Sequence, residues 1–422
     1  MNKKIIFLLF TCIFIALTYQ LTYDVCNYFA IIPGFNCNQY PLTYEYYIYG
    51  LIAFIPAFFV PFEGKKPSTI FINILYFFHV IPSILLIPKA IQGYVLESIV
   101  WGLTISVLFT LIVILSKGIH FKLPKIKNQL GLFIIFVLAM VAIAFSVIIV
   151  SRHGFKFEIP NITDVYGLRE EFKENSDAIT LYATLLGGYF ISPILILIAI
   201  NRKFDLLSKI LVVISLLLIF IIFSSSGIKS IAFSSIVTIF FYFLIKKIKN
   251  FGLSLIIFIT TVIGFAFTLF KLTPIDLVYI HWLRRIQVVP GLNTSRFYEY
   301  FILKSDTLAE STYSAPKLIS QYYYGTSGSA NAGIFGDAVG RFGLIGLLIN
   351  SILLLLILIV LNAITNKNNT NILAAMMILI GYAACNSSLL TVLLSYGLGP
   401  TILTVYLLQN TQFIKDKKWS NE

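Results

Sequence analysis

Residues 130–150 read LGLFIIFVLAMVAIAFSVIIV and contain no charged side chain. About 20 consecutive apolar residues are enough for an α-helix to cross the hydrocarbon core of a bilayer. The run does not alternate polar with apolar residues, as a strand of an outer-membrane barrel does over about 10 residues. This stretch therefore predicts a membrane-spanning helix, and much of the chain follows the same pattern.

The composition of the whole chain agrees with that prediction. Hydrophobic residues make up 58% of the 422 residues, charged residues 12%, and the mean hydropathy is +0.90. A soluble domain carries about 25% charged residues, so a soluble globule is excluded. We predict an all-α polytopic integral membrane protein, a single transmembrane domain over residues 1–422 with about twelve transmembrane helices. The apolar runs lie near 5–21, 46–62, 70–88, 94–116, 130–150, 178–200, 207–223, 228–245, 252–270, 342–361, 371–385 and 389–408.

The distribution of Lys and Arg predicts the orientation. Eighteen of the 31 basic residues lie in alternate connections, starting with the N-terminus. Cytoplasmic loops carry an excess of Lys and Arg. Both termini are therefore expected in the cytoplasm, and segments 151–177 and 271–341 are expected to be extracytoplasmic loops. The net charge of +13 is explained by these membrane-edge residues and their contacts with lipid, so no nucleic-acid partner is expected.

The large polar segment, residues 271–341, holds most of the candidate functional residues. Arg284 and Arg285 follow an aromatic stretch, and guanidinium groups match phosphate oxygens bidentately. Interfacial anchoring on lipid headgroups is an equally good interpretation of this stretch. The candidate phosphate-binding residues are Arg284, Arg285, Arg296, Arg341 and Lys229, the last from a serine-rich turn between two spans. A lysine in that position could also simply extend to the interface.

Aromatic and glycine residues of the same segment suggest contacts with a sugar. Trp and Tyr rings stack on sugar faces, and the candidates are Trp282, Tyr298 and Tyr323. Glycines at 333, 336, 340 and 343 share one helical face, which favours tight helix packing. Asp337 and Arg341 are four residues apart and can pair on that helix.

Several classes of site are not indicated. The chain has no GxxxxGK[ST] loop and no HExxH motif, and its four histidines are scattered. No metal and no cofactor are therefore predicted. Cys26 and Cys37 share one polar segment, and their spacing is compatible with either a disulfide or two free thiols.

Residues 329–337, SANAGIFGD, followed by 341–346, RFGLIG, resemble the junction between polar loop and helix in O-antigen polymerases of the Wzy type. Residues Ser226 to Lys229 are similar to a Ser-Arg segment of these polymerases and of the related O-antigen ligases, with Lys229 in place of arginine. The resemblance implies a GT-C-like membrane fold with a large extracytoplasmic loop in the bacterial inner (cytoplasmic) membrane.

The resemblance also implies a reaction. Such an enzyme polymerises undecaprenyl-diphosphate-linked oligosaccharide repeat units into O-antigen or capsular polysaccharide. Membrane lipid is a further partner, and a chain-length regulator protein is a candidate one. Fixed cations would neutralise the diphosphate leaving group, and a base would take the proton of the acceptor hydroxyl. The candidate catalytic residues are Glu299, Asp306, His281 and Asp337.

Three alternatives stay open from the sequence. An O-antigen ligase would use the same lipid-linked donor. A lipid-linked oligosaccharide flippase or transporter should carry charges inside its spans, because such charges mark substrate pathways, and this chain has few. A structural membrane scaffold would not need clustered arginines.

Overall fold

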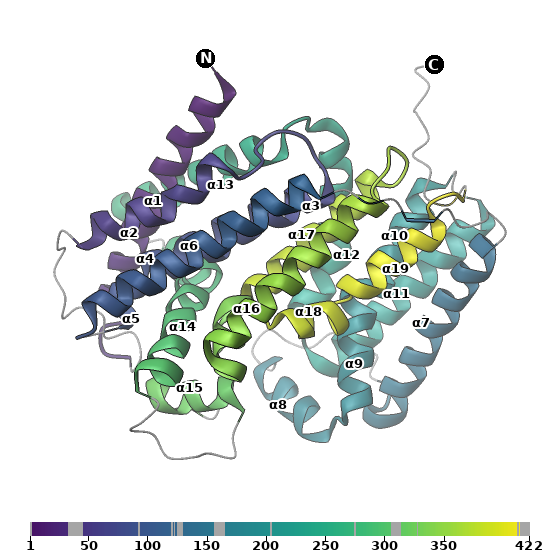
Figure 1. Ribbon diagram of the computed structural model, residues 1–422. Helices are drawn as coiled ribbons and strands as arrows, with labels where there is room; N and C mark the ends of the chain where they lie inside the picture. Colours follow the sequence, from purple (N-terminus) through teal and green to yellow (C-terminus); the bar gives the residue numbers. More distant parts are fainter. Residues whose placement is uncertain are drawn as a thin grey trace.

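The structure, a computed structural model, is a bundle of helices (Figure 1). It describes residues 2–32, 45–91, 93–119, 121, 123–124, 130–155, 165–202, 205–273, 276–304, 314–326, 328–411 and 413. Within these ranges no β-strand occurs, and one isolated bridge joins Gly64 to Asn250. The α-helices are α1 (Lys3–Tyr28), α2 (Glu45–Phe54), α3 (Pro67–Leu75), α4 (Ile81–Leu85), α5 (Ile87–Ala90), α6 (Val95–Gly118), α7 (Gly131–His153), α8 (Val165–Asn175), α9 (Ala178–Leu186), α10 (Ser192–Asn201), α11 (Leu206–Ser226), α12 (Lys229–Lys247), α13 (Phe251–Leu272), α14 (Val289–Tyr298), α15 (Ala315–Tyr324), α16 (Gly333–Ile364), α17 (Thr370–Asn386), α18 (Leu389–Leu394) and α19 (Leu398–Leu408).

Short helical turns of other geometry connect or extend several of these helices. Ile55–Phe58 is a 3₁₀ turn after α2. The π-helical turns are Tyr76–Val80, Gly187–Ile191, Leu277–Trp282, Arg284–Val288 and Glu299–Leu303.

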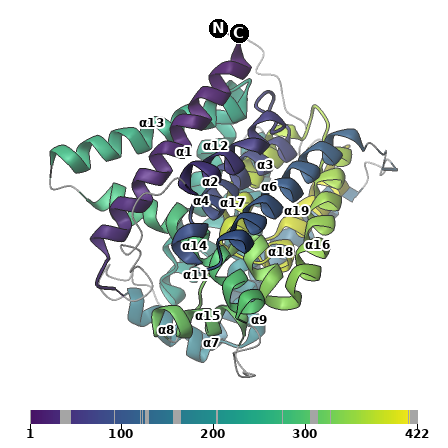
Figure 2. The ribbon, with the colours of Figure 1, turned by 60° about the vertical axis from the view of Figure 1, so that its left-hand side comes forward.

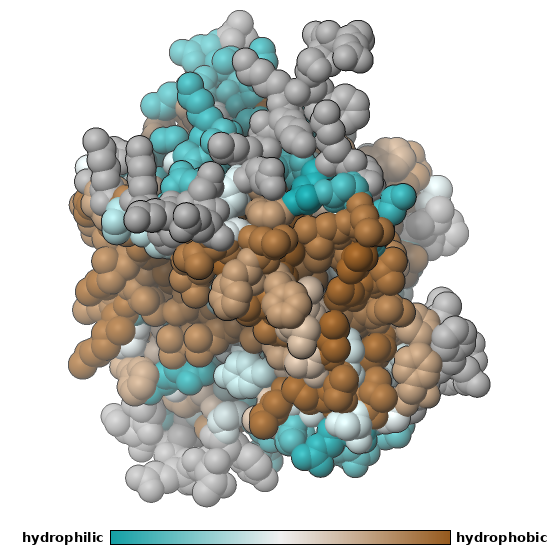
Figure 3. All heavy atoms as spheres, turned by 90° about the vertical axis from the view of Figure 1, so that its right-hand side faces the viewer, coloured by the Kyte–Doolittle hydropathy of each residue, from teal (hydrophilic) through white to brown (hydrophobic). Residues whose placement is uncertain are grey.

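The predicted all-α membrane protein is confirmed. Ten helical stretches in the described part are long and apolar enough to cross a bilayer, and two shorter apolar helices cover Tyr46–Phe58 and Thr370–Asn386. Each of these stretches overlaps one of the apolar runs of the sequence, with bounds that differ by up to nine residues. Figure 3 shows the result on one face, where a hydrophobic belt separates two more hydrophilic ends. Such a belt is the surface that a bilayer covers.

The spans differ in how deeply they are buried. The stretch Pro67–Leu85 is almost wholly buried and forms the centre of the bundle. Helix α7 is at the periphery, and large apolar side chains such as Phe133 and Phe136 are exposed on it. In a membrane these side chains face lipid, because lipid tails are as apolar as the side chains themselves.

The local sequence explains where the spans begin and end. Helix α11 starts after Asp205, whose carboxylate accepts a hydrogen bond from the backbone N–H of Ser208 at 2.9 Å. This is the usual role of an N-cap residue. The helix ends at Gly227, which adopts the left-handed conformation with φ +61° that glycine accepts without strain. The sharp turn lets α12 begin two residues later.

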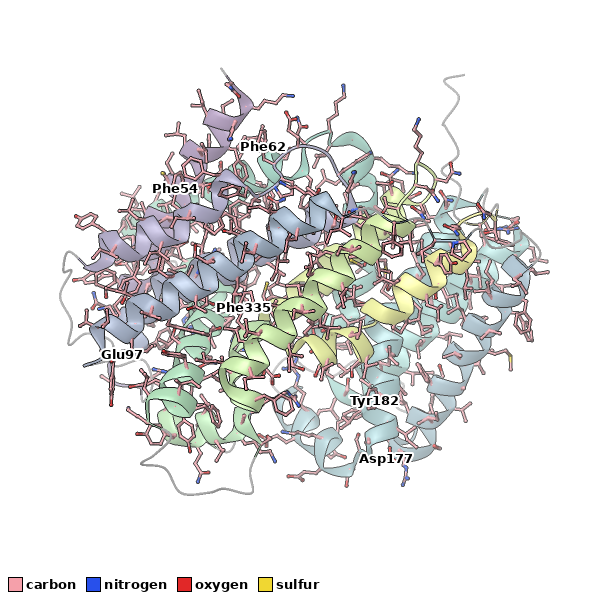
Figure 4. The ribbon with its side chains drawn as sticks, in the orientation of Figure 1. Phe54, Phe62, Glu97, Asp177, Tyr182 and Phe335 are labelled. Atoms are coloured by element: carbon pink, nitrogen blue, oxygen red, sulfur yellow. The ribbon has the colours of Figure 1, made fainter. Side chains whose placement is uncertain are left out.

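Contacts between connections bring three of the basic connections together. Lys3 pairs with Glu63 at 3.5 Å, and Lys65 donates to the carbonyl of Ile245 at 3.1 Å. These basic connections therefore gather at one end of the bundle. Helices α8 and α15 lie at the other end, away from the start of α1, in both ribbon views (Figures 1 and 2). In Figure 4, Asp177 is at that lower end and Phe62 is at the upper end.

The segment 271–341 is largely helical where it is described, and it packs into the bundle. Helix α14 lies against both α4 and α16, and all of its residues from Pro290 to Tyr298 are buried. A Cβ atom on Gly291 would lie 2.7 Å from the carbonyl of Pro82 in α4. In this part, the segment that was predicted as an extracytoplasmic loop is therefore a buried helix, which packs between α4 and α16.

Glycines on α16 allow the close approach on the other side of α14. A Cβ on Gly336 would lie 3.0 Å from the Cα of Thr294, and one on Gly340 would lie 2.7 Å from Phe297. The predicted glycine face is thus a packing face. It is interrupted at Phe342 and Gly343, where α16 is kinked and Gly343 has φ +59°.

Candidate functional site

A cavity of about 1270 Å³ lies between the polar segment and four helices of the bundle. One part of its wall is apolar and comes from α3, α12, α13 and α17. The other part is polar and comes mainly from the segment 284–331 and the end of α17. The described polar lining residues are Tyr189, Ser230, Ser234, Ser254, Arg284, Arg285, Asn293, Ser320, Tyr324, Thr326, Ser329, Asn331, Tyr382, Asn386, Ser387 and Tyr396. Of these, Ser234 on α12 and Ser254 on α13 interrupt the otherwise apolar part. The cavity is therefore amphipathic along its length.

Two adjacent cations mark the polar end. Arg284 and Arg285 both line the cavity, and no described lining residue is an Asp or a Glu. The guanidinium carbon of Arg284 lies 4.0 Å from the ring centroid of Phe29, just after α1. This cation–π contact holds Arg284 in place, whereas Arg285 is exposed. The wall thus offers two positive charges to an anionic ligand.

Hydrogen bonds hold the neutral polar groups of the wall in place. Tyr324 donates its hydroxyl proton to Oδ1 of Asn293 at 2.6 Å, and Nδ2 of Asn293 donates to the carbonyl of Asn331 at 2.9 Å. Burial raises the pKa of Tyr324 above its ordinary value, and the nearby Arg296 guanidinium opposes that shift. Tyr324 therefore stays neutral and can position a ligand by hydrogen bonding.

Arg296 and Glu299 form a second, buried layer behind this wall. The Arg296 guanidinium lies between the rings of Tyr323 and Tyr324, 4.9 and 4.8 Å from their centroids. Glu299 accepts a hydrogen bond from Tyr323 at 2.6 Å and pairs with Lys304 at 2.8 Å. Burial, followed by the negative charge of Glu299, raises the pKa of Tyr323. Neither Arg296 nor Glu299 lines the cavity, so the structure makes them supports of α15.

Other predicted site residues lie away from the cavity wall. Asp337 and Arg341 pair with each other at 2.6 Å, as their spacing predicts. Trp282 is 58% exposed. Tyr298 stacks on Trp101 of α6, with ring centroids 4.4 Å apart. That stacking occupies one face of the Tyr298 ring, and the residue is only 6% exposed.

The remaining predicted residues fall into three cases. His281 lies 3.9 Å from Asp276 and does not line the cavity. Lys229 is at the start of α12, next to the lining residue Ser230. Asp306 and Cys37 lie outside the described residues.

No metal site is found in the described part of the chain, where no group of three or more His, Cys, Asp or Glu residues could hold an ion. The free thiols there belong to Cys12 and Cys385.

Sequence reasoning identified Arg284 and Arg285 but missed the neutral half of the wall. Asn293 and Tyr324 gave no charge signal, and Asn386 stands at the break between two apolar runs. Three π-helical turns contribute to the wall, through Phe78, Tyr189 and the two arginines. Such turns are frequent at functional sites, but they depend on tertiary packing and have no simple sequence signature.

Comparison of the chain with protein-family models, curated proteins and solved structures finds no match. The fold itself defines the class, a multi-pass helical membrane protein with an amphipathic cavity that runs from the polar segment along α12 and α13.

Proposed function

We propose that this protein polymerises lipid-diphosphate-linked oligosaccharide repeat units at the extracytoplasmic face of a bacterial inner membrane. The observation that carries the proposal is the cavity. Arg284 and Arg285 stand at one end of it without a carboxylate in the described wall, and phenylalanines of α12 and α13 line the other end. A ligand that matches both ends has an anionic head and a hydrocarbon tail. A GT-C-like arrangement of about twelve spans belongs to this proposal.

The chemistry assigned to the arginines is stabilisation of the leaving group. In glycosyl transfer from a lipid diphosphate, the bond between the anomeric carbon and the phosphate oxygen breaks, and the diphosphate departs with the electron pair. Two fixed guanidinium groups stabilise the charge that develops there, without a metal. A fixed donor of this kind contributes roughly 10²–10³-fold to a rate.

The neutral wall suits the glycan next to the diphosphate. Asn293, Asn331, Tyr324 and Ser320 present amide and hydroxyl groups, which recognise sugar hydroxyls by hydrogen bonding. The acceptor hydroxyl attacks the anomeric carbon and gives its proton to a base. The sequence offers Glu299, His281, Asp306 and Asp337 for that base. Glu299, His281 and Asp337 lie outside the cavity lining, and Asp306 lies outside the described residues, so the base is not assigned to one of them.

The distribution of charge favours a polymerase over a flippase. Among the described lining residues, charge is confined to 284–285, and the lining from α3, α12, α13 and α17 carries no charge. A flippase path is expected to carry charged groups along the crossing, because a charged headgroup in hydrocarbon is costly. The arrangement fits a head that stays at one membrane face.

The test is glycan analysis in cells that depend on this chain for polymer. Arg284→Ala and Arg285→Ala should abolish polymer while single repeat units persist. Arg285→Lys keeps the charge but loses the bidentate fork, so it should retain part of the polymer. Arg152→Ala is the matched control, because this exposed arginine pairs with Asp177 away from the cavity.

Each outcome has a distinct meaning. Polymer of unchanged length in both alanine variants would refute the proposal. If the final acceptor carried no glycan at all, not even single repeat units, the protein would instead be identified as a ligase.

A further inference from the structure

The apolar part of the cavity follows α12 for most of its length. The apolar lining residues of this helix and its C-cap are Phe233, Val237, Phe240, Phe241, Leu244 and Ile248, and Ser230 and Ser234 line its first turns. Their spacing of three to four residues places them on one helical face. From Phe233 to Ile248 a helix rises about 22 Å, most of the ~30 Å hydrocarbon core of a bilayer. The cavity therefore extends as a long groove beneath the polar end.

The opposite side of the groove is also mainly apolar. Helix α13 contributes Phe251, Leu255, Phe258 and Ile259 in the same periodic spacing, together with the hydroxyl of Ser254. The rim is open to the surrounding membrane, since Phe233 and Phe258 are 58% and 63% exposed. A hydrocarbon chain could enter sideways from the bilayer without passing through water.

The far end of the groove is closed by backbone contacts. Phe251 donates its N–H to the carbonyl of Gly64 at 2.9 Å, and Leu253 donates to Phe62 at 3.1 Å. Gly252 packs so tightly that a Cβ would lie 2.6 Å from Oδ1 of Asn73. The turn between α12 and α13 is thus fixed to the loop before α3, and the groove has a defined bottom.

We propose that this groove holds the single hydrocarbon chain of a polyprenyl carrier, whose phosphates contact Arg284 and Arg285. One feature favours this lipid over a membrane phospholipid. The polar end offers two positive charges with no carboxylate in its described lining, which matches a diphosphate better than a singly charged phosphodiester. The identity of the carrier rests on the proposed function, but occupation of the groove can be tested without it.

The experiment maps the chain end directly. The full-length protein is reconstituted in nanodiscs and incubated with a C55 polyprenyl diphosphate that carries a diazirine at its ω-end. After illumination, the labelled peptides are identified by mass spectrometry. Label is expected on the residues that line the groove between Phe233 and Phe258. Unlabelled polyprenyl diphosphate should compete, and an equal amount of phosphatidylglycerol should not.

A bulky residue in the groove provides the matched comparison. Val237→Trp should lower labelling about tenfold. A tenfold loss of affinity corresponds to roughly two methylene groups of the lipid chain that are no longer buried. Ile236→Trp is the control, because Ile236 is 61% exposed on α12 and does not line the cavity. Leu255→Trp gives a second block from α13 should Val237→Trp fail to fold. The labelling map of the unmodified protein does not depend on any variant.

The outcomes separate this inference from the proposed function. Label on other helices, equal competition by phosphatidylglycerol, or equal labelling of the blocked and control proteins would overturn the groove proposal. Labelling of the groove by the polyprenyl probe in a protein that makes no polymer in cells would support the lipid site and refute the polymerase.

Discussion

Gly291→Ala tests whether the polar segment really enters the bundle. The added Cβ would lie 2.7 Å from both carbonyl atoms of Pro82 and 2.7 Å from Cδ1 of Leu86. Ordinary contact needs about 3.5 Å, so α14 would have to move from α4 by several tenths of an ångström. Overpacking of this kind costs up to about 3 kcal/mol, and the helix propensity of alanine returns about 1 kcal/mol. The expected net loss is about 2 kcal/mol, or roughly 30-fold in the folding equilibrium.

The assay is unfolding of the purified protein in detergent, induced by heat or by denaturant. Size-exclusion chromatography checks that each variant is monodisperse. Gly264→Ala is the matched control, because the nearest atom to its Cβ is Cδ1 of Leu17 at 3.9 Å. That variant should be as stable as the parent or up to about 1 kcal/mol more stable. Equal stability of the two alanine variants would show that α14 does not pack on α4 as described.

Two further substitutions separate structural from ligand-binding roles. Glu299→Gln removes the carboxylate that pairs with Lys304 and accepts a hydrogen bond from Tyr323. Hydrogen bonds to charged groups contribute about 1.5–3 kcal/mol, so a thermal shift measurement should show a loss of stability in this range. An unchanged transition would contradict the buried network. Arg341→Ala should lower the free energy of unfolding by roughly 1–3 kcal/mol, because it leaves the carboxylate of Asp337, whose side chain is only 11% exposed, without its partner. Loss of polymer at unchanged stability would instead assign Arg341 to the ligand.

The sequence predicted the spans because a bilayer imposes a strong and local constraint on them. Residues 130–150 needed no knowledge of their neighbours to be recognised as a helix, and α7 coincides with them. The short basic connections likewise predicted which connections share one side of the membrane. The segment 271–341 behaved differently. It is polar enough to resemble a loop, but Gly291, Gly336 and Gly340 let it dock between helices, and such docking depends on residues distant in the sequence.

The candidate site was predictable in its charges and not in its neutral residues. Arg284 and Arg285 stood out because two adjacent arginines are rare beside apolar spans. Arg296 stood out equally, but the structure places it between two tyrosine rings behind the wall. Tyr298 was predicted to stack on a sugar, but in the structure its ring stacks on Trp101. Which side of a helix a polar group faces is decided by packing, and a single sequence does not contain that information.

The close packing of α14 has a consequence for biosynthesis. During translation α4 emerges first, α14 about two hundred residues later and α16 last of the three. A chain leaves the ribosome at about 5–20 residues per second, so α14 waits for its second neighbour. Asn331 and the first turns of α16 are needed to complete the wall that holds Asn293. A chain whose synthesis stops before Asn331 would therefore lack both the carbonyl that holds Asn293 and the α16 surface on which α14 packs, although Phe29, the contact of Arg284, is already made.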